Sequence, residues 1–210
     1  MIDIEVWSDV ACPWCYLGSR RLEQAIAASG AEVSVTWKSF QLNPAAAGRV
    51  AHNTLLMGKF GVSEEQVHQM NQRLVNLGED VGIEYRFETY ISVNTLDVHR
   101  VLHLARDRGL GTAAHDRMFK AQFTDGALMD DHDVLVGLAI EIGLDEAEVR
   151  SVLESDAYAD AVRAEQSEAA ALGASGVPFF VLDRKYGISG AQPVELFTQA
   201  LERAQEAVRA

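Results

Sequence analysis

The two cysteines of this 210-residue sequence stand three positions apart, in Cys12-Pro13-Trp14-Cys15. Apolar and charged residues alternate from Ile2 to Val6, which predicts a strand with one buried face. Apolar residues at helical spacing follow the cysteines as far as Gly30, where the pattern stops. The pair therefore falls where a strand leads into a helix, with a proline at the first-turn position that suits it.

A Cys-x-x-Cys sequence at the start of a helix has the parts needed for thiol–disulfide exchange. Unpaired backbone N–H groups and the positive end of the helix dipole stabilise a thiolate there, which favours Cys12 as the nucleophile. Cys15 lies one turn later on the same face, within reach of a small-ring disulfide, and is expected to be more buried. Cys12 would attack a substrate disulfide, and Cys15 would release the mixed disulfide as the resolving thiol.

Two other interpretations of the cysteine pair stay open at this point. The pair could be half of a zinc site completed by His99 and His103, which are four residues apart on one predicted helix face. It could also be two inert, packed thiols. The position directly after a strand favours redox chemistry, so we expect no bound metal.

Composition limits the function further. The net charge of −13 argues against nucleic-acid binding and against docking on anionic lipid, since both need a basic surface. The N-terminus shows no secretory signal, and no apolar run is long enough to span a membrane. We therefore expect a cytoplasmic protein, in which a disulfide would be transient and catalytic rather than structural.

The element pattern changes along the chain. The opening reads strand–helix–strand, whereas residues 63–172 are almost wholly helical, with one strand considered at 83–87. Strand signals return on either side of Asp183-Arg184, which predicts a hairpin, and a last amphipathic helix begins at Pro193. A sheet interrupted by a helical insertion is the simplest α/β arrangement with this order.

A second motif, Gly176-Val177-Pro178-Phe179, stands directly before a predicted strand. A proline that enters a strand is often an ordinary edge residue. It can also form a cis peptide that leaves the backbone of Val177 exposed to an extended substrate. The cysteine pair elsewhere in the chain gives weight to the cis interpretation.

Four motifs in order carry a family resemblance: residues 8–18, Phe40-Gln41-Leu42-Asn43-Pro44, residues 176–181, and Ser189-Gly190-Ala191-Gln192. Together they resemble the FrnE-type branch of the DsbA family over essentially the whole chain. The resemblance implies a thioredoxin fold, built from 1–44 and 174–210, with an all-helical insertion domain at 45–173. It also implies that Cys12 is the nucleophile, that Cys15 resolves, and that cis-Pro178 packs against them.

The same superfamily includes 2-hydroxychromene-2-carboxylate isomerases and kappa-class glutathione transferases, which have a serine where Cys12 stands. By resemblance, the Val177 backbone, Ser189 and Gln192 are expected to contact glutathione or a peptide, with Asn43 a weaker candidate. Pro13 and Trp14 complete the expected substrate contacts, although Trp14 could instead pack on the insertion domain. Periplasmic DsbA has an export signal and a histidine between its cysteines. This chain lacks both, so strong oxidising power is not expected.

The sequence thus predicts a disulfide oxidoreductase or isomerase that acts on peptide or small-molecule disulfides. No bound cofactor is expected, and glutathione is the expected co-substrate. The insertion would cover the cysteine pair and form a cleft for the substrate. A glutathione-dependent isomerase or transferase and a chaperone-like binding module remain alternatives, and the family suggests a homodimer. Asp9 either tunes Cys12 or accepts a hydrogen bond in the turn.

Overall fold

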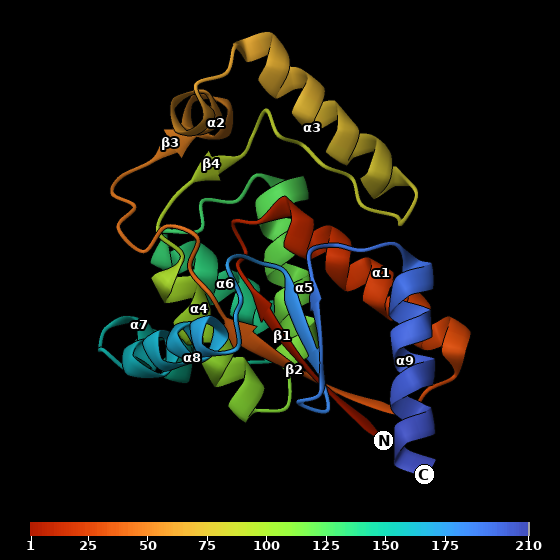
Figure 1. Ribbon diagram of the computed structural model, residues 1–210. Helices are drawn as coiled ribbons and strands as arrows, with labels where there is room; N and C mark the ends of the chain where they lie inside the picture. The colour runs from red at the N-terminus through yellow and green to blue at the C-terminus, as the bar shows by residue number, and fades with distance from the viewer. Residues whose placement is uncertain (210) are drawn as a thin grey trace. The chain divides into compact units, whose positions relative to one another are not determined.

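The computed structural model describes residues 1–209, which divide into two compact units. One unit, the sheet unit, comprises residues 1–42 and 160–210; the other, the helical unit, comprises residues 43–159. Figure 1 shows the elements of each. No helix of residues 1–209 combines the length and apolar character needed to cross a bilayer.

The sheet unit is built on four strands in the order β2-β1-β5-β6. The strands are β1 (Ile2–Ser8), β2 (Val33–Ser39), β5 (Phe179–Leu182) and β6 (Tyr186–Ser189). β1 pairs in parallel with β2 and antiparallel with β5, so it is a central strand with neighbours on both sides. Its even-numbered residues point to one face of the sheet, where the main core of this unit lies.

Helices cover both faces of this sheet. The core on one face includes Leu22 of α1 (Pro13–Ser29) and Phe197 of α9 (Val194–Arg209), helices that lie side by side in Figure 1. On the other face, Trp7 packs with Phe179 and with Ala169 of α8 (Ala159–Ala171). The α/β class and the thioredoxin-type layering expected from the sequence are therefore present.

The helix α8 corrects the expected second domain boundary, which placed residues 160–173 in the helical insertion. The structure groups these residues with the sheet unit. The Trp7 indole N–H donates to the Glu165 carbonyl over 2.9 Å, and the backbone N–H of Ser39 donates to the Glu165 carboxylate over 2.7 Å. These buried bonds attach α8 to the ends of β1 and β2, and no sequence periodicity could indicate them.

The local signals at the ends of elements are confirmed. Gly30 terminates α1 with a left-handed backbone (φ 60°), as the sequence predicts. The helical stretch that begins at residue 63 starts with a capping box between Ser63 and Gln66, the N-cap and third residue of α3. The predicted hairpin joins β5 to β6, with positive φ at Asp183 and Arg184.

The helical unit consists of six α-helices, one π-helical turn and two short strands within residues 43–159. They are β3 (Val50–Ala51), α2 (His52–Phe60), α3 (Glu64–Glu79), β4 (Ile91–Ser92), α4 (Leu96–Asp107), α5 (Gly111–Lys120), the π-helix η1 (Ala121–Asp125), α6 (His132–Glu141) and α7 (Glu146–Leu153). Helix α4 packs against α5, α6 and α7, while α2 packs against α3 (Figure 1).

The strand considered at 83–87 does not form. The backbone N–H of Arg86 donates to the carbonyl of Phe123, and Thr89 and Tyr90 make turn hydrogen bonds, so this segment has no ladder partner. The short strand lies further on, where β4 pairs antiparallel with β3. Aromatic packing of Tyr85 and Phe87 against Phe123 explains the apolar alternation that suggested a strand.

His52, the first residue of α2, is buried within the helical unit. Its ring stacks on Phe87 and Tyr90 at centroid distances of 5.1 and 4.5 Å, and its Nε2 lies 3.2 Å from Oδ1 of Asn71. Burial lowers the pKa of His52 from 6.5 to about 4, against the opposing effect of the Asn71 hydrogen bond. The folded protein therefore keeps this imidazole neutral at pH values where the unfolded chain protonates it.

This difference predicts a loss of stability on mild acidification. Between pH 6.5 and 4 the unfolded state binds the additional proton, so the contribution is fully present above pH 6.5 and falls as pH falls. We expect about 2 kcal/mol of the free energy of unfolding to be lost between pH 7.5 and 5 through this group. Urea unfolding at pH 7.5 and pH 5 measures this loss. Between the two pH values, the free energy of unfolding of His52→Gln should change by about 2 kcal/mol less than that of the wild type.

His68→Gln is the matched control, because His68 is exposed on α3 in the folded protein. This variant should keep the wild-type difference between the two pH values. Equal pH dependence in the wild type and in His52→Gln would contradict the assignment.

Candidate active site

The cysteine pair lies at the junction of β1 and α1. Cys12 is the N-cap residue of α1, Pro13 begins the helix, and the first turn contains no acidic side chain. The backbone N–H of Cys12 donates to the carbonyl oxygen of Asp9 over 2.9 Å, and the backbone N–H of Cys15 donates to the carbonyl oxygen of Cys12 over 3.0 Å. The Cys12 side chain thus stands at the positive end of the helix dipole, as the sequence predicts.

Cys12 meets the segment that precedes β5. Its Sγ lies 3.6 Å from the carbonyl oxygen of Val177, to which the thiol donates, and the Val177–Pro178 peptide is cis. Both cysteines carry thiols, and both are buried. Two motifs separated by most of the chain therefore meet at one place in the sheet unit.

Cys15 is the more deeply buried cysteine. Burial raises the pKa of the Cys15 thiol well above its ordinary value, and the hydrogen bond and charge of Cys12 raise it further. The backbone N–H of Asp9 and the hydroxyl of Ser8 act in the opposite direction. Because ionisation of Cys15 is disfavoured, Cys12 is the thiol suited to attack first.

The segment 189–192 begins with the last residue of β6 and lies against the cis peptide. The backbone N–H of Gly190 donates to the Pro178 carbonyl over 2.8 Å, and Gln192 Nε2 donates to the Ser189 carbonyl over 2.8 Å. Arg21 of α1 holds the same loop through its Nη1, which lies 2.7 Å from the Ala191 carbonyl. Ser189 and Gln192, both expected to contact substrate, are thereby placed beside Pro178.

The remaining expected contact residues are distributed differently. Trp14 is 36% exposed, as a substrate platform requires, and Pro13 is partly buried. Asn43 is exposed and belongs to the helical unit, where its carbonyl accepts the N–H of Ala46. The structure therefore brings all the expected residues except Asn43 into the sheet unit.

Asp9 shapes the turn that carries Cys12. Its carboxylate is buried and accepts the backbone N–H groups of Ala11 and Leu42, at 3.2 and 2.7 Å. The expected hydrogen bond within the turn is present, and a second bond links the turn to the segment after β2. Asp9 therefore fixes the backbone around Cys12, a role that a buried aspartate between strand and helix could have indicated.

Gly18 is a site residue to which the sequence assigned no role. A Cβ atom at this position would lie 3.1 Å from Cγ of Pro178 and 3.1 Å from Cζ of Phe180. The missing side chain of Gly18 lets α1 approach the cis-proline segment this closely, since an added Cβ would require these two rings to shift by a few tenths of an ångström. A glycine inside an amphipathic helix was the signal that could have found it.

The zinc interpretation gains no third ligand from the described residues, among which no three candidate metal-binding side chains are grouped. His103 of α4 accepts a hydrogen bond from Arg106 at 2.8 Å and stacks on Tyr158. His99, on the same helix, is buried. Packing within the helical unit accounts for the position of this histidine pair.

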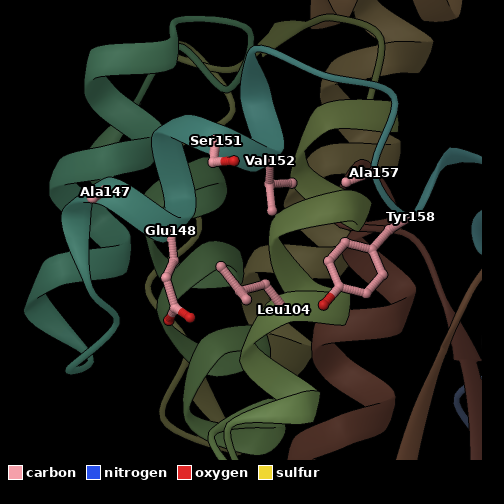
Figure 2. Close-up of a pocket in the computed structure, with 7 residues that line it drawn as sticks. All are labelled: Leu104, Ala147, Glu148, Ser151, Val152, Ala157 and Tyr158. Atoms are coloured by element: carbon pink, nitrogen blue, oxygen red, sulfur yellow. The ribbon is translucent and has the colours of Figure 1, made fainter.

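A hollow of about 520 Å³ in the helical unit is shown in Figure 2. It is lined by Leu104, Ala147, Glu148, Ser151, Val152, Ala157 and Tyr158. The Tyr158 hydroxyl donates to Asp107 over 2.8 Å, and Glu148 pairs with Arg108. Both ionisable groups of the lining are thus already engaged by neighbouring side chains.

The close approach at Gly18 yields a test by substitution. Gly18→Ala should lower the free energy of unfolding by about 1–3 kcal/mol, because the added methyl overpacks the contact with Pro178 and Phe180. Gly137→Ala is the matched control: this helical glycine of α6 has no atoms within 4 Å of its Cβ position. The control should gain up to about 1 kcal/mol from helix propensity. If urea unfolding shows that Gly18→Ala and Gly137→Ala change the free energy of unfolding in the same direction, the packing argument is contradicted.

Comparison with known proteins agrees with this geometry. The family model described as a DSBA-like thioredoxin domain matches residues 3–202. The Bacillus subtilis protein YwbO is 28% identical over 208 residues, 98% of each chain. A probable DsbA oxidoreductase from Streptomyces coelicolor is 46% identical and superimposes with a TM-score of 0.95, covering 98% of this chain and 91% of that one.

More distant structures share the fold. A 2-hydroxychromene-2-carboxylate isomerase is 17% identical with a TM-score of 0.74, covering 99% of both chains. The cytosolic disulfide reductase DsbM from Pseudomonas aeruginosa, in a structure with GSH, is 20% identical with a TM-score of 0.66, covering 97% of this chain and 99% of that one. The match over nearly the whole chain, with two cysteines and a cis-proline meeting at the start of α1, shows that this protein belongs to the DSBA-like thioredoxin domain family.

Proposed function

We propose that this protein is a FrnE-like dithiol–disulfide oxidoreductase in which Cys12 is the nucleophile and Cys15 the resolving thiol. The observation that carries the proposal is the position of Cys12 Sγ, at the start of α1 and 3.6 Å from the carbonyl of Val177. A thiol held there is close both to the helix dipole and to a backbone segment that can guide a substrate.

In the first step, the Cys12 thiolate attacks one sulfur of a substrate disulfide R–S–S–R′. A bond forms between Cys12 Sγ and the sulfur of R, the S–S bond of the substrate breaks, and R′S⁻ leaves and takes up a proton. The Val177 backbone, next to the cis-proline, positions an extended peptide or small disulfide, with Pro13, Trp14, Ser189 and Gln192 as further contacts. Asn43 is the weaker candidate for the same role.

In the second step, the Cys15 thiolate attacks Cys12 Sγ and displaces R as its thiolate. The substrate is then reduced to two thiols, and the protein holds a Cys12–Cys15 disulfide. Cys15 is one turn behind Cys12 and buried, so it is shielded from external disulfides and available for this intramolecular attack. The deep burial of Cys15 thus supports its assignment as the second thiol to react.

Glutathione is the co-substrate we propose for returning the disulfide to the dithiol, in the cytoplasm. The support is the similarity in fold to the cytosolic reductase DsbM, whose structure includes GSH. The sequence offers no second cysteine pair for that step. A small external thiol is therefore the simplest chemical class of electron donor.

An intact-mass redox titration in glutathione buffers tests the mechanism. The wild type should interconvert between the dithiol and a species lighter by the two thiol hydrogens. Cys15→Ser should accumulate one glutathione adduct on Cys12, since the resolving thiol is missing, and Cys12→Ser should form neither product. The absence of an internal disulfide at every glutathione ratio would overturn the proposal.

The same variants separate the alternative functions. A glutathione-dependent isomerase or transferase would keep its activity in Cys15→Ser and require glutathione. A chaperone-like module would bind clients equally well without either cysteine. Either outcome, together with the absence of an internal disulfide in the wild type, would replace the oxidoreductase assignment.

A further inference from the structure

The segment 189–192 contains two of the proposed substrate contacts and leaves the sheet beside the cis-proline. The ladder between β5 and β6 ends where Phe179 pairs with Ser189. One residue further on, the backbone N–H of Gly190 donates to the Pro178 carbonyl over 2.8 Å, and the chain turns there with a positive φ of 80°. The position of Gln192 relative to the cis peptide therefore depends on contacts from outside the ladder.

Arg21 supplies such a contact from α1. Its Nη1 donates to the Ala191 carbonyl over 2.7 Å, in a partly buried hydrogen bond between residues 170 positions apart. The neighbouring Arg20 instead pairs with Glu23 on its own helix over 2.8 Å, an ordinary contact of a helix surface. A hydrogen bond from a charged donor is stronger than a neutral one, and partial burial strengthens it further. Arg21 thus attaches the segment 189–192 to the helix that begins at Cys12.

The packing at Gly18 brings the same face of α1 against this segment. A Cβ atom added at Gly18 would lie 3.1 Å from Cγ of Pro178 and 3.5 Å from Cβ of Ala191. Arg21 is three residues further along the helix and so shares this face. The hydrogen bond of Arg21 therefore continues a contact in which α1 touches both the cis-proline and the segment after it.

Helix α1 thus holds the proposed substrate-binding backbone at two places, which differ in how they respond to the reaction. At the first place, the Cys12 thiol donates to the Val177 carbonyl over 3.6 Å. An ionised Cys12, or a Cys12 bonded to a substrate sulfur, has no proton to donate, so that bond is lost when exchange begins. At the second place, the Arg21 guanidinium stays protonated and keeps its donors throughout.

We propose that Arg21 is a positioning residue, which keeps the segment 189–192 against the cis-proline while a substrate sulfur is bonded to Cys12. It favours substrates long enough to reach that segment, such as an extended peptide disulfide, over small alkyl disulfides. The exchange step is the one described above, and Arg21 contributes no atom or proton to it. This inference rests on the proposed dithiol mechanism and adds a residue that selects its substrate by length.

Two uncharged disulfides test this role in the Cys15→Ser background, in which the adduct on Cys12 accumulates. One is the disulfide of a cysteine tripeptide blocked at both ends, and the other is bis(2-hydroxyethyl) disulfide, which is too short to reach the segment. Intact-mass analysis of quenched samples gives the second-order rate constant of adduct formation. Because neither probe is charged, direct attraction of the substrate by the guanidinium does not contribute.

Arg21→Met should slow the reaction with the peptide disulfide by about tenfold and leave the reaction with the small disulfide unchanged. Arg21→Lys, which keeps a charged donor, should restore the rate with the peptide in part. Arg20→Met is the matched control, because it removes the same charge from the same helix, and both of its rates should equal those of Cys15→Ser alone.

The outcomes separate the two levels of the argument. An unchanged peptide rate in Arg21→Met, or equal slowing with both probes, would overturn the role of Arg21, since a general disturbance of α1 would affect both reactions. Equal slowing in Arg20→Met would overturn it as well. If neither disulfide forms an adduct with Cys15→Ser and the wild type forms no internal disulfide, the dithiol mechanism itself is overturned.

Amide hydrogen exchange tests the position of the segment without a substrate. The N–H of Gly190 is protected by its bond to the Pro178 carbonyl, so Arg21→Met should make its exchange about tenfold faster. The N–H of Gly30, which donates to the Ile26 carbonyl at the end of α1, is the reference and should exchange at the wild-type rate. Equal exchange at Gly190 in the wild type and in Arg21→Met would refute the proposal.

Discussion

The contact between Cys12 Sγ and the Val177 carbonyl depends on one constraint, the antiparallel pairing of β1 with β5. Because the two strands run in opposite directions, the end of β1 lies beside the beginning of β5, and Trp7 pairs with Phe179. Whatever follows β1 must then meet whatever precedes β5. The cysteine turn and the cis-proline segment occupy those two positions, so strand pairing brings together groups 165 residues apart.

The same constraint explains which residues around the site are small or polar. Helix α1 leaves the end of β1 and crosses the beginning of β5, so its second turn must pass over Pro178 and Phe180. Gly18 permits that crossing, and Arg21 one turn later attaches the helix to the loop after β6. On the other face, α8 is fastened through Glu165 to Trp7 and Ser39. The site is thus fixed from both faces of a single sheet.

The sequence predicted the parts of this arrangement that have local signals. The spacing of the cysteines, the alternation along β1 and the stop at Gly30 all depend on neighbouring residues, and the structure contains each of them. The place of α8 could not be predicted in this way, because its attachment depends on bonds to strands more than 120 residues away. The strand considered at 83–87 was wrong although its local signal was present. The apolar alternation there reflects aromatic packing, and the backbone hydrogen bonds of this segment are not those of a strand.

Burial makes the two cysteines chemically unequal, and in the dithiol mechanism proposed above that inequality would order the two steps. If both thiols ionised readily, either could capture a substrate, and capture by Cys15 would have to proceed inside a packed core. Desolvation disfavours the Cys15 thiolate, so in the proposed mechanism Cys12 would react with the substrate first. Loss of the Cys12 charge at that moment removes one of the effects that raise the pKa of Cys15. Formation of the mixed disulfide would therefore favour the thiolate that resolves it, and the proposed order of the two steps follows from where each sulfur lies.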